Sequence, residues 1–249
     1  MAFNVAADAY DSFMGRYSVQ LGPQIADLAG VEPGRRVLDV GCGPGALTAE
    51  LLQRGAKVSA VDPSPQFVAA AQERYPAADV RQAAAESLPF AHGEFDAALA
   101  QLVVHFMADP LRGVEEMVRV TREEGVVAAS VWDMAGGRAP ISPFWRAARE
   151  LEPDVEGESN RAGAAEGELA HLFVQAGLRE VEEEALPVQV EHPTFDEWWL
   201  PFTLGVGPAG EYYNRLEPAQ QSALEQRLRE QLPEPLRLET RAWAARGIV

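Results

Sequence analysis

The sequence is poor in cysteine and in basic residues, and both shortages narrow the classes of protein it can represent. Cys42 is the only cysteine in 249 residues, so neither an intramolecular disulfide nor a cysteine metal cluster can form. Lys57 is the only lysine, and the net charge is −17. Because phosphate backbones are bound by clustered Arg and Lys, this charge argues against nucleic acid as a partner.

Long apolar runs and targeting segments are also missing. No stretch approaches the ~18 uninterrupted apolar residues of a transmembrane helix, so we expect no membrane insertion. The opening MAFNVAADAY has neither the basic nor the apolar region of a signal peptide, which predicts a cytoplasmic protein. A hydrophobic content of 47% in a chain of this length suits one large α/β domain.

Short apolar strands alternate with helical segments along most of the chain. This rhythm predicts βαβ units and a mostly parallel sheet. A helix is expected over 110–125, ended by a glycine, and residues 154–168 are expected to form a mobile loop. The last strand alternates like an antiparallel edge. We expect a helical leader over 1–33, a Rossmann-like core over 34–193, a helical cap inserted over 194–232, and the last strand over 233–249.

The stretch VLDVGCGPG, residues 37–45, is a glycine-rich turn after a strand. Gly41, Gly43 and Ala46 fit the dinucleotide pattern, and Asp62 lies 21 residues beyond Gly41, where that pattern places an acid. Asp39 argues for a different ligand, since a carboxylate repels a pyrophosphate and attracts an ammonium. Pro44 removes an N–H that an anion would use.

Several further motifs follow in order: AVDPS at 60–64, AAAESLPF at 83–90, FDAALAQLVVHF at 95–106 and the stretch from Val114 to Trp132. Together with the glycine turn they resemble the class I S-adenosylmethionine-dependent methyltransferases. The resemblance is nearest to the small-molecule group that includes the quinone-biosynthesis C-methyltransferases. It covers about Tyr10 to Trp132 and implies a doubly wound seven-stranded sheet whose last strand is antiparallel.

The resemblance also implies which residues hold S-adenosylmethionine. The glycine turn would wrap the methionine half, Asp62 would accept hydrogen bonds from the ribose hydroxyls, and Arg16 would pair with the carboxylate. Asp62 is alternatively a helix N-cap, and Cys42 is alternatively a small apolar filler. The full expected set is Tyr10, Arg16, Asp39, Gly41, Cys42, Gly43, Asp62, Pro63, Ser64, Ala85, Glu86, Gln101 and Leu102.

One position departs from the family pattern. Ala84 stands where an acid normally binds the adenine amino group, so adenine would depend on Ala85, Glu86 and apolar stacking. Glu86 is equally readable as a residue at a helix entry. The missing acid leaves a non-catalytic cofactor-binding module open as an alternative, beside a nicotinamide-dependent oxidoreductase.

The acceptor site is expected under the cap. A run of aromatic side chains there suggests an apolar pocket that excludes water, with a separate cap core or a dimer surface as the alternative. His105 is either a general base or a packed neutral histidine. The expected pocket residues are His105, Trp198, Trp199, Phe202 and Tyr212. We expect methylation of a small, largely apolar acceptor without a metal; the methylated atom and the oligomeric state, a homodimer included, stay open.

Overall fold

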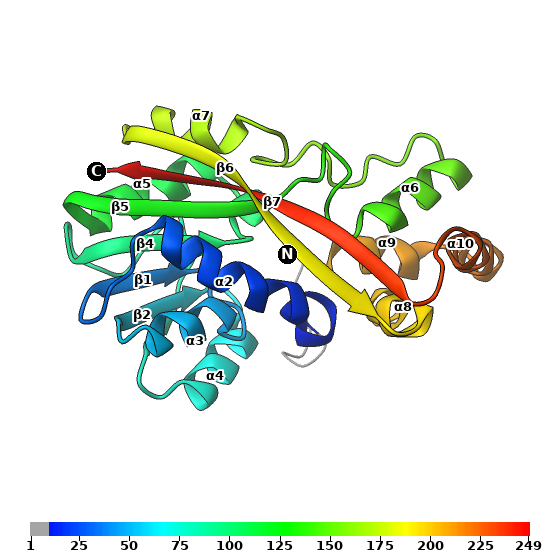
Figure 1. Cartoon of the computed structure of the whole chain (residues 1–249), viewed down its shortest axis with the longest axis horizontal. Helices are drawn as coiled ribbons and strands as arrows, with labels where there is room; N and C mark the ends of the chain where they lie inside the picture. The colour runs from blue at the N-terminus through cyan, green and yellow to red at the C-terminus, as the bar shows by residue number, and fades with distance from the viewer. Residues whose placement is uncertain (1–9) are drawn as a thin grey trace.

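A seven-stranded sheet in the order β3-β2-β1-β4-β5-β7-β6 organises the chain (Figure 1). The computed structural model describes residues 10–249. β7 is antiparallel to both of its neighbours, β5 and β6. The predicted Rossmann-like sheet with an antiparallel last strand is therefore confirmed. β7 is nevertheless an interior strand and not the edge strand that its alternating pattern suggests, because the long β6 pairs with its outer side and forms the edge. The strands are β1 Arg36–Val40, β2 Lys57–Asp62, β3 Asp79–Gln82, β4 Phe95–Gln101, β5 Thr121–Trp132, β6 Arg179–His192 and β7 Leu236–Ile248.

Helices cover both faces of this sheet because its buried strands are apolar on both sides. In β1, Val37 packs with the helices of one face and Leu38 with those of the other. The first face carries α2 (Arg16–Leu28), α3 (Ala46–Gln53) and α4 (Pro65–Arg74), and the second carries α5 (Pro110–Val120) and α7 (Glu168–Gln175). The carboxyl ends of β1, β2, β4 and β5 consequently meet at one edge.

The helix predicted over 110–125 ends earlier, at Val120. The hydroxyl of Thr121 donates to the carbonyl of Met117 at 2.8 Å, and Thr121 already pairs with Phe95 of β4. The glycine at 125 lies inside β5, so its position did not mark the helix end. Pairing with β4 overrides the local helical pattern here.

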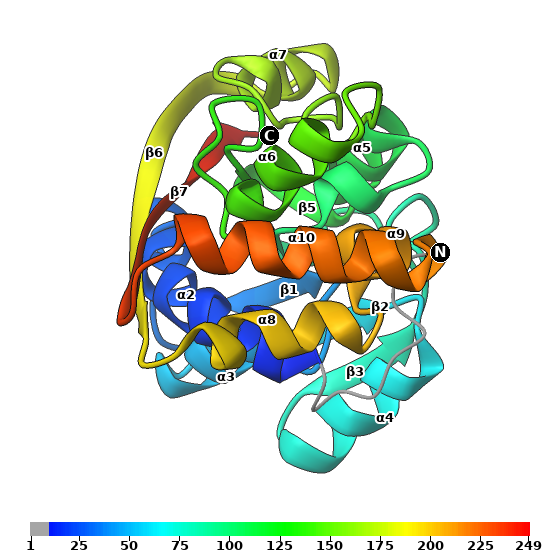
Figure 2. The same ribbon diagram turned by 90° about the vertical axis from the view of Figure 1, so that its right-hand side faces the viewer.

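A helical cap lies between the last two strands, as predicted. It consists of α8 (Phe195–Thr203), α9 (Gly207–Arg215) and α10 (Pro218–Gln231), and α6 (Ser142–Leu151) packs beside it (Figure 2). β6 and β7 are 14 and 13 residues long and extend past the other strands to reach the cap (Figure 1). The cap therefore stands beside the carboxyl edge of the parallel strands.

Two short irregular helices complete this edge. η1, a π-helix over Asp11–Gly15, precedes α2, and η2, a 3₁₀-helix over Val104–Phe106, follows β4. π-helical turns are uncommon and occur often at functional sites. Within residues 10–249, none of the helices has the length and apolarity that crossing a membrane requires.

The cap core predicts a stability effect. Phe202 is fully buried and stacks on Phe144 of α6 with 4.8 Å between ring centroids, whereas Leu200 on the same helix is 58% exposed. Phe202→Ala should lower the free energy of unfolding by about 3–5 kcal/mol, and Leu200→Ala by less than about 0.5 kcal/mol. Urea unfolding of both variants measures this; equal losses would contradict the packing described.

Candidate functional site

The glycine turn bends back over the end of β2. The N–H groups of Gly41 and Cys42 both donate to the carbonyl of Val61, at 2.8 and 2.9 Å. Gly41 has a φ of 72°, and a Cβ there would lie 2.5 Å from the side chain of Val103. Only glycine combines that backbone conformation with so close an approach. The turn is thereby fixed against both β2 and the segment after β4.

Asp62, the last residue of β2, connects this turn to α4. Its Oδ2 accepts the N–H of Gly43 at 2.9 Å, and its Oδ1 accepts the N–H of Ser64 at 2.8 Å. Ser64 is itself the N-cap of α4, so Asp62 does not serve as the cap. A carboxylate has about four acceptor positions, and the described part of the chain occupies two of those on Asp62, which leaves two for hydroxyl donors. Burial raises the pKa of Asp62 although both backbone bonds lower it.

Asp39 lies buried beneath the turn. Its Oδ2 accepts the hydroxyl of Thr48 on α3 at 2.6 Å. Burial raises the pKa of Asp39 to about 7, and the bond from Thr48 only partly opposes this. A carboxyl group poised in this way gains from a nearby cation, which would favour its ionised form. Cys42 packs among Ala60, Val68 and Ala71, and burial raises the pKa of its thiol, which fits the role of an apolar filler.

The aromatic ring of Tyr10 covers the turn from the leader. It lies 4.0 Å from the position of a Cβ on Gly43 and contacts Phe67 of α4 with 5.4 Å between ring centroids. Burial, followed by the charge of Asp62, raises the pKa of the Tyr10 hydroxyl. An ion pair of 2.6 Å between Asp11 and Arg74 fastens η1 to α4 nearby. The leader is thus part of the site.

Two other expected cofactor residues have protein partners instead. Arg16 lies 3.1 Å from Nδ1 of His192 and 3.7 Å from the carboxylate of Glu197, on the side of β6 and α8. Gln101 donates its Nε2 to the carbonyl of Ser18 at 3.0 Å, and its Oε1 is buried with no partner among the described residues. The structure does not bring either side chain to the glycine turn.

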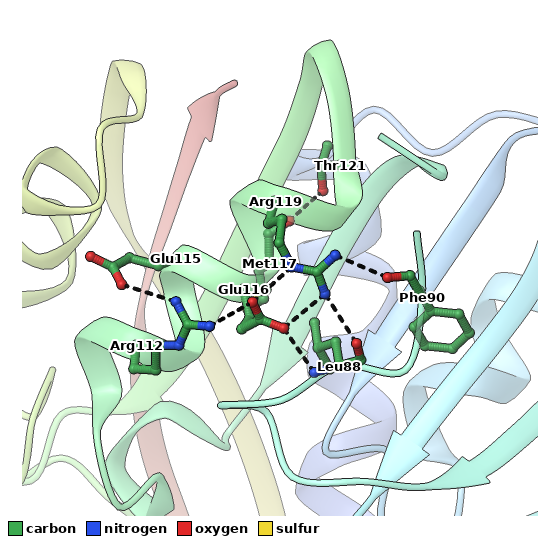
Figure 3. Close-up of polar contacts among 8 residues, drawn as sticks. All are labelled: Leu88, Phe90, Arg112, Glu115, Glu116, Met117, Arg119 and Thr121. Atoms are coloured by element: carbon green, nitrogen blue, oxygen red, sulfur yellow. Dashed lines mark hydrogen bonds and ion pairs between the residues drawn. The ribbon is translucent and has the colours of Figure 1, made fainter. Parts of the chain in front are cut away.

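The loop after β3 is braced from α5. Glu116 accepts the N–H of Leu88 at 2.9 Å and two bonds from Arg119, which also donates to the carbonyls of Leu88 and Phe90 (Figure 3). These bonds, the one to Arg119 first, lower the pKa of Glu116 despite its burial. Arg112 approaches the same carboxylate at 3.0 Å. A buried charge with this many partners holds the loop in one conformation.

The adenine side of the expected site lies on this loop. Glu86 accepts the N–H groups of Ala108 and Asp109 at the entry to α5, so the structure uses it as a helix-entry residue. Ala85 is buried beside α5, and Ala84 and Pro63 are exposed.

An apolar pocket adjoins the glycine turn across Tyr10. The cavity itself is about 30 Å³, and the empty space in and in front of it, open solvent included, is about 400 Å³. Leu102, in its wall, has a φ of 62°, an unfavourable conformation for a side chain of this size, and such strain is concentrated at functional sites. The pocket residues are Tyr10, Phe13, Met14, Leu102, His105, Phe106, Trp132, Met134, Ile141, Glu158, Gly207, Pro208 and Ala209.

The comparisons with known proteins agree with this fold. Residues 38–129 match the family model described as "Methyltransferase domain". A Thermotoga maritima S-adenosylmethionine-dependent methyltransferase superposes with a TM-score of 0.57 at 18% identity, over 97% of this chain and 95% of that one. Residues 38–129 form a methyltransferase domain. S-adenosylmethionine is the cofactor that such a domain implies, and the free acceptor positions of Asp62 and the buried carboxyl of Asp39 fit its hydroxyls and ammonium.

The curated relatives align with only part of this chain and with only part of their own length. An uncharacterised Mycobacterium bovis protein is 38% identical over 120 residues, 47% of this chain and 44% of its own length. The malonyl-[acyl-carrier protein] O-methyltransferase of Pseudescherichia vulneris is 36% identical over 151 residues, 59% of this chain and 57% of its own length. The chain spans about half the length of the curated relatives it matches.

Of the expected acceptor residues, the pocket of the methyltransferase domain contains only His105. Trp198, Trp199, Phe202 and Tyr212 are buried in the shared core of the cap and α6 and do not line it. The cap reaches the pocket through the start of α9 instead, at Gly207–Ala209. Burial, with the charge of Arg161, lowers the pKa of His105 to about 3, so the ring is neutral near pH 7 and a weak base.

Sequence reasoning missed most of the wall. Phe13 and Met14 come from η1, and Glu158 comes from the segment predicted to be a mobile loop. Glu158 is only 2% exposed and accepts the indole N–H of Trp145 at 3.0 Å. It also borders an outer depression in front of α6, which shares Met134 and Ile141 with the pocket. An acid in a glycine-rich stretch carries no sequence signal of such burial.

Asp39 predicts a pH effect on stability. Its pKa is about 7 in the folded chain and near 3.8 when unfolded, so the folded state binds the extra proton between these values. Stability from this group is therefore present below pH 4 and lost as the pH rises through 7. In wild type, this group should lower the free energy of unfolding by about 4 kcal/mol as the pH rises from 4 to 7. Asp39→Asn should abolish that decrease.

Urea unfolding at pH 4.5, 6 and 7.5 measures that difference. Asp79→Asn, at an exposed position on β3, is the matched control and should parallel wild type. Parallel profiles for Asp39→Asn and wild type would show that the carboxyl titrates as an ordinary exposed one.

Proposed function

We propose that the protein transfers a methyl group from S-adenosylmethionine to a small, largely apolar acceptor. One observation carries the proposal: a carboxylate with two free acceptor positions, Asp62, lies at the same sheet edge as an apolar pocket, with Tyr10 between them. The methyltransferase domain matched over 38–129 supports the choice of cofactor.

Different residues would bind different parts of S-adenosylmethionine. Asp62 would accept the two ribose hydroxyls, the glycine turn would lie along the methionine half, and Asp39 would favour the ammonium through the turn. Ala85 and the loop braced by Glu116 would lie beside the adenine. When bound, S-adenosylmethionine supplies an activated methyl group on a sulfonium.

The pocket would orient the acceptor and keep water out. Transfer from an activated sulfonium depends mainly on alignment and a dry site. The pocket wall is almost wholly apolar or aromatic, and the Tyr10 ring is a favourable neighbour for a positive sulfonium. The low pKa of His105 gives no support to the general base considered from the sequence.

Calorimetry with S-adenosylmethionine tests the cofactor assignment. We expect binding of S-adenosylmethionine and S-adenosylhomocysteine, and none of NAD(H) or NADP(H), which would exclude the oxidoreductase alternative. Asp62→Ala should weaken S-adenosylhomocysteine about 100-fold, because two hydrogen bonds to a charged group contribute about 3 kcal/mol. Asp79→Ala, on the exposed neighbouring strand, should bind like wild type.

Asp62 also braces the turn, so a second ligand separates the two effects. Wild type should prefer S-adenosylhomocysteine to its 2′,3′-dideoxy analogue, and Asp62→Ala should not distinguish them. An undiminished preference in the variant would refute the ribose assignment. Cofactor binding without transfer to any member of a broad acceptor panel would favour the non-catalytic module.

A further inference from the structure

The pocket wall is apolar apart from three side chains, and two of these, His105 and Glu158, belong to residues that Arg161 connects. Both side chains are at least 95% buried, and they come from segments far apart in the sequence, η2 and the stretch between α6 and α7. Tyr10 brings the third polar group, beside the glycine turn. We call His105 and Glu158 the polar end of the pocket.

His105 has an unused hydrogen-bonding atom in this position. Its Nδ1 is buried and has no partner within residues 10–249. The residue is held by other contacts: its carbonyl accepts Nη1 of Arg161 at 3.2 Å, and its ring lies on Phe106 with 4.0 Å between centroids. A buried polar atom without a partner is unfavourable, and it marks a place where a ligand can complete the bonding.

Glu158 is also incompletely satisfied. Its Oε2 accepts the indole N–H of Trp145 at 3.0 Å, while its Oε1 lies 3.6 Å from Nε of Arg161. That separation is too long for a direct hydrogen bond, and Nε of Arg161 is itself buried without a partner in the described chain. The pair is close enough for charge compensation and leaves hydrogen-bonding capacity beside the pocket.

The charges at this end select against ionised ligands. Glu158 and Arg161 compensate one another, and His105 is neutral because burial and Arg161 lower its pKa to about 3. A cationic ligand would lose its water beside Arg161, and an anionic ligand would lose its water beside Glu158. Neither gains an unopposed partner in return, so desolvation disfavours both.

We propose that the polar end recognises a hydroxyl group on an uncharged, otherwise apolar acceptor. A hydroxyl donates and accepts at once, so it can accept the Nδ1–H of His105, in the tautomer that protonates this nitrogen, and donate to a carboxylate oxygen of Glu158. A carbonyl can only accept, and an aliphatic amine is charged at neutral pH. Arg161 is a positioning residue that compensates Glu158 and joins its segment to η2.

This inference rests on the proposed function, because it takes the pocket to be the acceptor site. It names the group that is recognised and leaves the methylated atom open, since hydroxylated aromatic molecules accept methyl groups at oxygen or at a neighbouring carbon. The probes that test it share one skeleton and differ in a single group. They are 4-ethylphenol, 4-ethyltoluene, 4-ethylbenzoate and 4-ethylbenzylamine.

Binding of each probe is measured by calorimetry at pH 7.5 with S-adenosylhomocysteine at saturation. Wild type should bind 4-ethylphenol at least tenfold tighter than the other three. His105→Phe should remove the preference for 4-ethylphenol over 4-ethyltoluene. Glu158→Gln keeps an acceptor for Trp145 and should reduce the preference for 4-ethylphenol over 4-ethylbenzoate at least fivefold.

Two variants serve as matched controls. His171→Phe changes an exposed histidine on α7, and Glu156→Gln changes an exposed acid two residues before Glu158. Both should retain the wild-type preferences, and all four variants should bind S-adenosylhomocysteine within twofold of wild type. If a variant fails to fold, the binding of the four probes to wild type still tests the hydroxyl assignment by itself.

The outcomes separate this inference from the proposed function. If S-adenosylhomocysteine binds and 4-ethylphenol shows no advantage over 4-ethyltoluene, or the charged probes bind more tightly, the hydroxyl assignment is overturned and the cofactor assignment stands. Absence of 4-ethylphenol binding to the loaded protein overturns it as well. If S-adenosylhomocysteine does not bind, the proposed function fails.

Discussion

The carboxylate of Asp62 is the interaction on which the candidate site depends. It accepts N–H groups from the turn after β1 and from the start of α4, and so joins three segments at the end of β2. Its burial would be unfavourable without these bonds. The close packing of Gly41 against Val103 sets the turn in the place where Asp62 can hold it.

The pocket shows how a parallel sheet gathers distant segments. Because the crossover helices return the chain to the same side each time, the loops after β1, β2, β4 and β5 open at one edge. The leader, η2, the stretch after α6 and the first turn of α9 meet there and supply the pocket wall. The long antiparallel pair β6 and β7 carries the cap to that edge (Figures 1 and 2). The pocket therefore exists only where these segments meet.

The sequence was most informative where function and backbone geometry coincide. The glycines of the turn and Asp62 at a strand end follow from spacing alone, and the structure brings Gly43 and Asp62 within hydrogen-bonding distance. The aromatic run in the cap was misleading. Trp198 and Phe202 carry the composition of an apolar pocket, but the cap helices must pack on α6 and on the leader, and these rings fill the core that they share. Composition does not distinguish a ring that faces a ligand from one that faces another helix.

By itself, the sequence determined the sheet, its antiparallel last strand, the inserted cap and the turn that approaches Asp62. These features depend on local periodicity, on glycine and on short spacings, which the chain carries from residue to residue. The tertiary structure alone decided the wall of the pocket. Glu158 and His105 lie more than fifty residues apart, and only the closing of the segment after α6 onto η2 through Arg161 places both beside one cavity. The burial of Glu158 and the neutrality of His105 result from that packing, so no local sequence pattern could predict them.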